Sequence, residues 1–206
     1  MSTGRLEAFS DGVLAVAITL LVLDLKASTD RAAGSLAHQL GHDWASFAAY
    51  AVSFLVIGTI WVNHNALFAL AARVDRVLMF YNLLLLLFVT TIPFTTSTYA
   101  SFLRHGGSDA RVAVLVYGAS NTGMAVGFTL ILARLVRHNM TIRPVTGNPR
   151  SVIARFGLGV LLYPLVSLIS LAWPPLMLII YLLLAVYYMF EQTPFLRTQG
   201  ASAEPG

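Results

Sequence analysis

The chain has no cysteine and few charged residues. None of its 206 residues is cysteine, and Asp, Glu, Lys and Arg together make up only 11%. The lack of cysteine excludes a disulfide framework, thiol catalysis and a metal site built on thiolates. Hydrophobic residues make up 57% of the sequence, which is more than a soluble domain of this size can bury. The composition therefore predicts a polytopic membrane protein, with no room for a separate soluble domain.

Six apolar runs of roughly membrane-spanning length divide the sequence. A helix rises about 1.5 Å per residue, so about 20 residues cross the hydrocarbon core. The runs are Phe9–Leu25, Trp44–Ala71, Val77–Tyr99, Val112–Leu135, Val152–Leu171 and Pro175–Phe190. We expect residues 1–192 to form one all-α transmembrane unit of six helices, and the polar residues 193–206 to form a short disordered tail.

The basic residues are unequally divided between the two sides of this topology. With six spans, one side holds both termini and all of the 13 Lys and Arg residues except Lys26, Arg31, Arg104 and Arg111. The positive-inside rule then places both termini in the cytoplasm. The same distribution explains the net charge of +4. Because the arginines lie between apolar runs and form no stripe, we expect no nucleic-acid partner.

Charged residues stand at the start of the first apolar run, where lipid is expected. A carboxylate such as Asp11 inside a membrane helix costs about 2.5–3.5 kcal/mol on insertion scales, so it normally faces protein or water. Glu7 and Asp11 also argue against a cleaved signal peptide, which has a basic segment and a small-residue cleavage site. The first helix is therefore expected to do more than anchor the chain.

The first predicted helix has two different faces. At 100° per residue, one face carries Val16, Thr19, Leu20 and Leu23. Ser10 and Asp11 lie on the opposite side. The first face has two interpretations. It is either a surface for lipid or helix packing, with the Thr19 hydroxyl bonded to a carbonyl near Ala15, or the lining of a narrow pore with apolar rings and one hydroxyl ring.

The second predicted helix carries polar residues that can hold Asp11. In the segment WVNHN, Trp61, His64 and Asn65 share one face because they are three or four residues apart. Each can donate a hydrogen bond to a carboxylate. We expect these residues to join helices; the alternative is a proton or ion relay through His64.

The other polar residues indicate neither a catalytic nor a metal site. His38 and His42 are four residues apart, but no third metal ligand is evident, so no metal and no cofactor are expected. Asn82 and Asn121 are interpreted as donors between packed helices, and the GxxxG motif at residues 123–127 as a packing face. Without a catalytic triad or a phosphate-binding loop, the chain is not expected to be an enzyme.

The motif Arg5-x-x-x-Phe9-Ser10-Asp11, at the start of six spans, resembles the signature of the transmembrane protein 175 family of endolysosomal potassium channels, and in particular of its bacterial relatives. The resemblance continues through GVLAVAITLLVLDLK, SFLVIGTIWVNHNALF and NLLLLLFVTTIPF. It covers the first half of the chain, whereas the last three spans match only in number and length.

This resemblance implies a passive cation channel, permeable to potassium and other monovalent cations, in the lipid bilayer of a bacterial plasma (inner) membrane. It implies a homotetramer whose pore is lined by the first helix of each subunit. The constriction then falls on Val16, Thr19, Leu20 and Leu23. The family's structural network falls on Arg5, Phe9, Ser10, Asp11, Trp61, His64 and Asn65. Val16 departs from the family's bulkier residue, which would move the principal gate to Leu20 or Leu23.

Two functions of other classes stay open from the residues alone. One is a proton-coupled secondary transporter with Asp11 and His64 as its relay, and the other is a non-conducting membrane scaffold. Transporters often contain inverted repeats and broken helices, and the sequence shows neither. A fourfold axis along the first helix would favour the channel over both alternatives.

Overall fold

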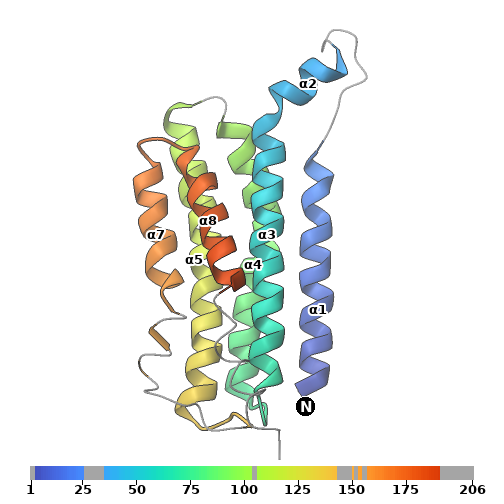
Figure 1. Ribbon diagram of the computed structural model, residues 1–206, viewed down its shortest axis with the longest axis vertical. Helices are drawn as coiled ribbons and strands as arrows, with labels where there is room; N and C mark the ends of the chain where they lie inside the picture. Colours follow the sequence, from blue (N-terminus) through green and yellow to red (C-terminus); the bar gives the residue numbers. More distant parts are fainter. Residues whose placement is uncertain are drawn as a thin grey trace, which may run out of the picture.

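The computed structural model describes residues 3–25, 35–103, 106–142, 150, 153–154 and 157–190. The regular elements in these ranges are helices: α1 (Thr3–Leu20), the 3₁₀ helix η1 (Leu21–Asp24), α2 (Leu36–His42), α3 (Trp44–Ala69), α4 (Arg76–Leu103), α5 (Gly107–Arg137), α7 (Gly159–Ser170) and α8 (Leu176–Phe190). The helices run alternately in opposite directions, with α2 leaning out at one end (Figure 1). The prediction of an all-helical protein is confirmed.

Four of the helices are long and apolar enough to cross a membrane: α1 with η1, α3, α4 and α5. The apolar helices α7 and α8 have 12 and 15 residues, which at 1.5 Å per residue is about 18 and 22 Å, less than the hydrocarbon core of about 30 Å. By length and composition, the described residues thus support four of the six predicted spans. Val152, the predicted start of the fifth span, and the tail 193–206 lie outside the described residues.

The helix boundaries differ from the predicted runs mainly at the charged ends. α1 begins at Thr3 rather than at Phe9, because helical structure takes in the charged residues before the apolar run. α4 continues through Pro93 to Leu103, and α5 begins at Gly107. At these three helix ends, helical structure extends beyond the predicted apolar run.

α1 stands at one side of a bundle built around α4 and α5. These two helices have the most extensive mutual contact; α3 packs on α4 and α8, and α7 packs on α5. α1 contacts mainly α3 and α4. Only 28% of its apolar window is buried, against 39%, 39% and 56% in α3, α4 and α5. The first helix is thus the least covered of the four.

The GxxxG motif allows α5 to lie close against α4. A Cβ atom added to Gly127 would lie 2.7 Å from the Cα and 2.9 Å from the backbone nitrogen of Leu85. A Cβ on Gly123 would overlap the ring of Phe88. Small residues let two helices approach closely in lipid, where packing rather than the hydrophobic effect holds them together. The motif therefore lies at the closest contact of the bundle's central pair.

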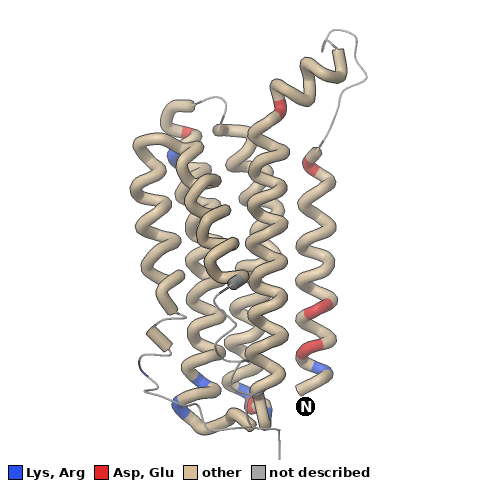
Figure 2. Tube along the Cα trace, in the orientation of Figure 1, with Lys and Arg blue, Asp and Glu red and all other residues tan. Residues whose placement is uncertain are grey.

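Most basic positions gather at the end of the bundle where α1 begins (Figure 2). At this end the turn between α3 and α4 is bonded to the segment after α5. The amide of Ala72 donates to the carbonyl of Met140, and the amide of Ile142 to that of Leu70, both at 2.8 Å. These paired bonds tie the turn between α3 and α4 to the residues that follow α5.

Asp75 strengthens the same junction from two directions. Its Oδ1 accepts from the amide of Leu78 at 2.8 Å, which caps α4. Its Oδ2 accepts from Nε of Arg134, on α5, at 3.1 Å. The Arg134 guanidinium, followed by the Leu78 amide, lowers the pKa of Asp75 below its usual 3.8. The charged carboxylate is thus the form that the folded state favours.

We predict that Gly127→Ala destabilises the protein by about 1–3 kcal/mol, the usual cost of overpacking, because the backbone of Leu85 cannot move aside. The matched control is Gly58→Ala on α3, where an added Cβ meets nothing within 4 Å. That change is expected to be neutral or stabilising by up to about 1 kcal/mol through helix propensity. Thermal unfolding in detergent measures both, and equal effects would contradict the close contact.

We also predict that Asp75→Asn lowers stability at neutral pH by less than about 1 kcal/mol, because the pair is partly exposed and Asn can still cap α4. A lowered folded-state pKa gives stability that is present above the unfolded pKa and is lost as pH falls through the folded value. The melting temperatures of the wild type and Asp75→Asn should therefore converge below about pH 3.8. Asp75→Ala, which removes the cap as well, should cost more; a pH-independent difference would exclude the ion pair.

Candidate functional site: the first helix and its anchor

One face of α1 is buried against the bundle. It carries Leu6, Ser10, Leu14 and Ala17, and Leu21 of η1 continues the row. These residues are three or four positions apart, the spacing that keeps side chains on one side of a helix. Ser10 is the single polar member of the row, and its side chain is fully buried. α1 therefore packs through an apolar stripe with one hydroxyl in it.

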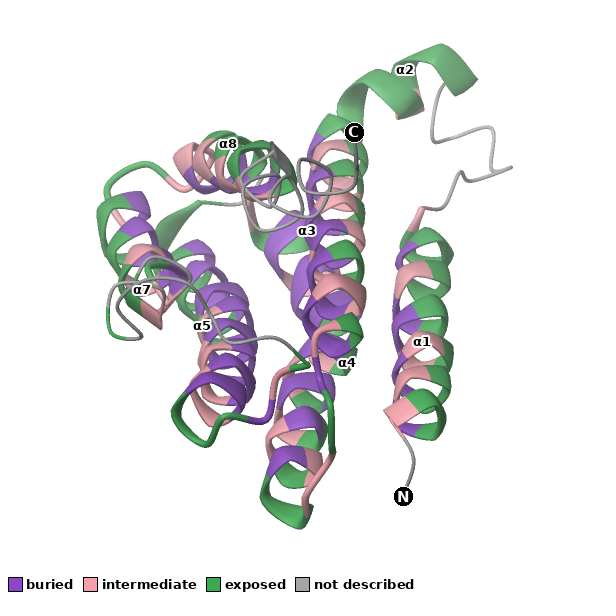
Figure 3. Cartoon of the chain, turned by 60° about the horizontal axis from the view of Figure 1, so that its bottom comes forward, coloured by how far each residue is buried: buried purple, intermediate pink, exposed green. Residues whose placement is uncertain are grey.

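The opposite face of α1 is exposed and largely apolar. Val16 is 55% exposed and Leu23 is 63% exposed, and Thr19 and Leu20 are exposed beside them. Figure 3 shows this exposed side turned away from α3. An apolar surface of this kind needs lipid or another protein chain as its neighbour. All four residues assigned to a constriction in the sequence analysis thus lie on the uncovered face.

A chain of three buried polar side chains joins α1 to α4 and α3. Ser10 Oγ accepts a hydrogen bond from Asn82 Nδ2 at 2.8 Å and donates to the carbonyl of Leu6 at 2.9 Å. Asn82 Oδ1 lies 2.8 Å from Nε2 of His64. An amide oxygen only accepts, so Nε2 of His64 carries the proton. The chain Ser10–Asn82–His64 is fully buried.

Asp11 has a different partner from Ser10. The indole N–H of Trp61 donates to its Oδ1 at 2.9 Å. Trp61 is 45% exposed, so this bond lies at the edge of the contact between α1 and α3. His64 is bonded to Asn82 rather than to Asp11, and its Nδ1 has no hydrogen-bond partner among the described residues. The carboxylate and the imidazole are therefore held in separate hydrogen bonds.

The remaining candidate residues differ in their exposure and hydrogen bonding. Arg5 and Phe9 lie on the exposed side of α1. Asn65 forms no hydrogen bond through its side chain within the described ranges. The Thr19 hydroxyl donates to the carbonyl of Val16 at 2.9 Å, one residue beyond the acceptor expected from the sequence. Within this chain the Thr19 hydroxyl proton is thus already bonded, and the hydroxyl oxygen can still accept a hydrogen bond or contact a cation.

Asn82 was interpreted from the sequence as a donor between packed helices, and it does join α4 to α1 and α3, although its particular partners were not predicted. A buried hydroxyl cluster was not found from the sequence. In it, Ser53 Oγ lies 2.7 Å from Thr96 Oγ1 and 2.8 Å from the Tyr117 hydroxyl. Its members come from α3, α4 and α5, so it joins the bundle without α1.

His38 and His42 stack on α2 with ring centroids 6.4 Å apart. Within the part of the chain that the structure describes, no three His, Asp or Glu residues are grouped as a metal site requires.

Comparison with known proteins identifies the family. The pattern of the family described as endosomal/lysosomal potassium channel TMEM175 matches residues 5–93. A potassium channel of Streptomyces collinus is 45% identical over 202 residues, which are 97% of this chain and 98% of that protein. The chain belongs to the TMEM175 family. The resemblance stated from the Arg5–Asp11 motif is confirmed, and the family is one of ion channels rather than enzymes.

Solved structures of TMEM175 proteins agree with the fold. The crystal structure of a lysosomal potassium-selective channel TMEM175 homolog from Chamaesiphon minutus is 34% identical, with a TM-score of 0.80 over 93% of this chain and 98% of that one. The human endosomal/lysosomal proton channel TMEM175 is 32% identical over 185 residues, which are 84% of this chain but 36% of the human protein. This chain therefore corresponds to about one third of the human relative.

We predict that Asn82→Leu destabilises the protein by about 2–6 kcal/mol, because buried groups of Ser10 and His64 each lose a partner at about 1–3 kcal/mol. Leucine has a similar volume, so the loss of packing is small. Asn121→Leu is the control, since Asn121 bonds only within its own helix, to the Tyr117 carbonyl at 2.9 Å. In detergent, Asn82→Leu should also increase hydrogen exchange in α1, and Asn121→Leu should not. Unchanged exchange in α1 would contradict the anchoring role.

Proposed function

We propose that four copies of this chain form a passive, potassium-permeable cation channel whose pore is lined by α1 of each copy. The observation that carries the proposal is the exposed apolar face of α1, which the monomer leaves uncovered beside a firmly anchored buried face. The relatives named potassium channels support the choice of ion. In this arrangement the four exposed faces meet around one axis.

The local helix geometry supports consecutive apolar rings near one end of this pore. α1 ends at Leu20 and continues as the 3₁₀ helix Leu21–Asp24. In a 3₁₀ helix, residues three positions apart eclipse one another. Leu20 and Leu23 would therefore lie almost directly above one another along the pore axis. Hydrophobic constrictions of this kind gate by losing water, and the Thr19 hydroxyls below them offer oxygens to a partly dehydrated ion.

We further propose that α7 and α8 serve as the fifth and sixth spans, with both termini in the cytoplasm of a bacterium. The charge distribution supports this orientation, because Arg73, Arg76, Arg134 and Arg137 belong to the end of the bundle at which α1 begins (Figure 2). The short helices α7 and α8 lie on the side of the bundle away from α1 (Figure 1), where they do not bear on the pore.

The proposal predicts that Leu23→Ala raises potassium flux into liposomes several-fold, because a smaller ring widens and hydrates the constriction. The control is Leu161→Ala on α7, which makes the same change at a side chain that is 70% exposed. Leu161→Ala should leave the flux unchanged. Thr19→Val should alter the potassium-to-sodium ratio of the flux, because it removes the hydroxyl ring and keeps the shape of the side chain.

Three results would contradict the proposal. The first is a flux that is indifferent to Val16, Thr19 and Leu23. The second is an uphill potassium flux driven by a pH gradient, which would support a transporter. The third is a particle without a fourfold axis along α1, which would support a scaffold if no flux is seen. Because mammalian relatives are named proton channels, a pH-sensitive dye in the same liposomes should measure proton flux in parallel.

A further inference from the structure

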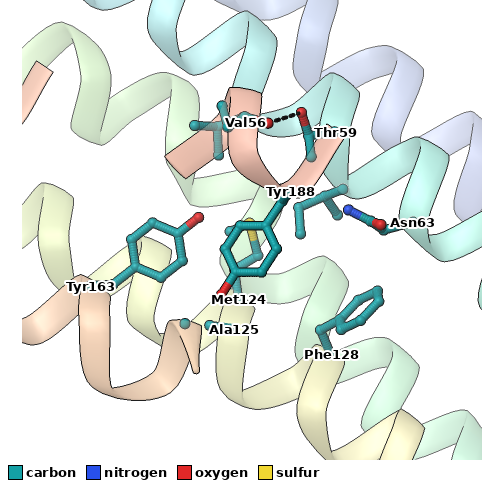
Figure 4. Close-up of a pocket in the computed structure, with 11 residues that line it drawn as sticks. Val56, Thr59, Asn63, Met124, Ala125, Phe128, Tyr163 and Tyr188 are labelled. Carbon is teal, nitrogen blue, oxygen red and sulfur yellow. Dashed lines mark hydrogen bonds between the residues drawn. The ribbon is translucent and has the colours of Figure 1, made fainter. Parts of the chain in front are cut away.

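A second feature of the bundle lies away from α1. A partly open cavity of about 40 Å³ lies between α3, α5, α7 and α8 (Figure 4). Its apolar walls include Val56, Ile60, Met124 and Phe128. Among the residues that the structure describes, its lining includes no Asp, Glu, Lys, Arg or His. Because none of these lining residues is charged, a molecule held there is expected to be neutral.

Several polar side chains line this cavity. Asn63 is only 7% exposed and Tyr163 only 5% exposed, and neither side chain forms a hydrogen bond with any described residue. The Tyr188 hydroxyl is buried and has no well-formed hydrogen bond to a described residue, although the backbone of Gly159 lies close to it. In Figure 4 the ring of Tyr188 lies between Tyr163 and Asn63. Thr59 differs, because its hydroxyl donates to the carbonyl of Ala185 at 3.3 Å.

Gly159 keeps this space open where α7 begins. A Cβ atom at this position would lie 3.3 Å from both the Tyr188 hydroxyl and Cε2 of Tyr163, and 3.4 Å from Cβ of Ala125. The two tyrosines and the wall of α5 thus converge on a residue without a side chain. Any larger residue would occupy the space beside the Tyr188 hydroxyl.

An occupant that bonds to the buried Tyr188 hydroxyl would remove the cost of leaving it without a well-formed hydrogen bond. Each buried group without a hydrogen bond costs about 1–3 kcal/mol. A buried water needs about 10–15 Å³ and two to four polar partners, and 40 Å³ gives room for about three such waters. The Asn63 amide can both donate and accept, as can a tyrosine hydroxyl. A hydroxyl group can hydrogen-bond to the Asn63 amide and to the tyrosine hydroxyls. The apolar wall beside them can accept a short carbon chain.

We propose that this cavity binds a neutral hydroxyl-bearing molecule, water or a short-chain alcohol, held by the Asn63 amide and the Tyr163 and Tyr188 hydroxyls. The site is separate from the exposed face of α1. Its existence does not depend on whether the chain conducts ions, so the proposed function and this site can fail independently.

Crystals of the full chain, with and without 2-bromoethanol, test the proposal. Without the alcohol we expect ordered water within hydrogen-bond distance of Asn63 and Tyr188. With it, an anomalous bromine peak should appear in the cavity at an occupancy that saturates with concentration, and this result would identify an alcohol site. Water that the alcohol never displaces would identify a water site. A dry cavity that accepts xenon, or side chains that bond to each other across a closed space, would overturn the proposal.

Variants of the lining decide whether the polar groups hold the occupant. Asn63→Leu should displace the ordered water and raise the alcohol concentration for half occupancy about two- to tenfold, the equivalent of one net hydrogen bond. Thr59→Val is the matched control, because the Thr59 hydroxyl is already bonded to Ala185, and it should change neither. Bromoethane, which lacks the hydroxyl, should bind the wild type more weakly than 2-bromoethanol. Equal occupancy by both probes, or equal effects of the two variants, would overturn the assignment.

Discussion

The chain of hydrogen bonds from Ser10 through Asn82 to His64 fixes how α1 is attached. α1 contacts the bundle along one stripe, and in lipid an apolar stripe alone gives little preference for one rotation of a helix over another, since lipid tails are as apolar as leucine. A buried polar group left without a partner, in contrast, is costly. The Ser10 hydroxyl therefore selects the rotation at which it meets Asn82, and the exposed face of α1 follows from that selection.

A one-residue change in the rotation of α1 would be strongly opposed. Each residue turns the helix by 100°, so such a shift would bring Phe9 or Asp11 towards the position of Ser10. The first would leave the Asn82 Nδ2 group without its acceptor, and the second would place a carboxylate in the buried contact. The bond from Trp61 to Asp11 adds a second restraint at the edge of the same contact. Charge near the start of α1 thus serves attachment, and the apolar residues opposite it are left free to face an axis.

The sequence predicted the two faces of α1 because helical periodicity depends only on residue spacing. It also predicted that Ser10, Asp11, Trp61 and His64 join helices. It did not predict that His64 would bond to Asn82, because that choice depends on how α4 is placed beside α3. Nor did it predict the lengths of α7 and α8, since an apolar run gives the extent of hydrophobic sequence and not where helical hydrogen bonding begins. Nor did the sequence predict the cavity lined by Asn63 and Tyr163, because its walls come from α3, α5, α7 and α8, and residue spacing does not tell how these helices pack.

Attachment and constriction are separated along α1. From Ser10 to Leu23 the helix rises by about 20 Å at 1.5 Å per residue. The polar residues that anchor α1, Ser10 and Asp11, therefore lie far from the proposed constriction at Leu20 and Leu23. A change of side chain at those two positions would alter the width and hydration of the proposed pore and leave the polar anchor intact. The polar anchor and the proposed constriction can therefore be altered independently of each other.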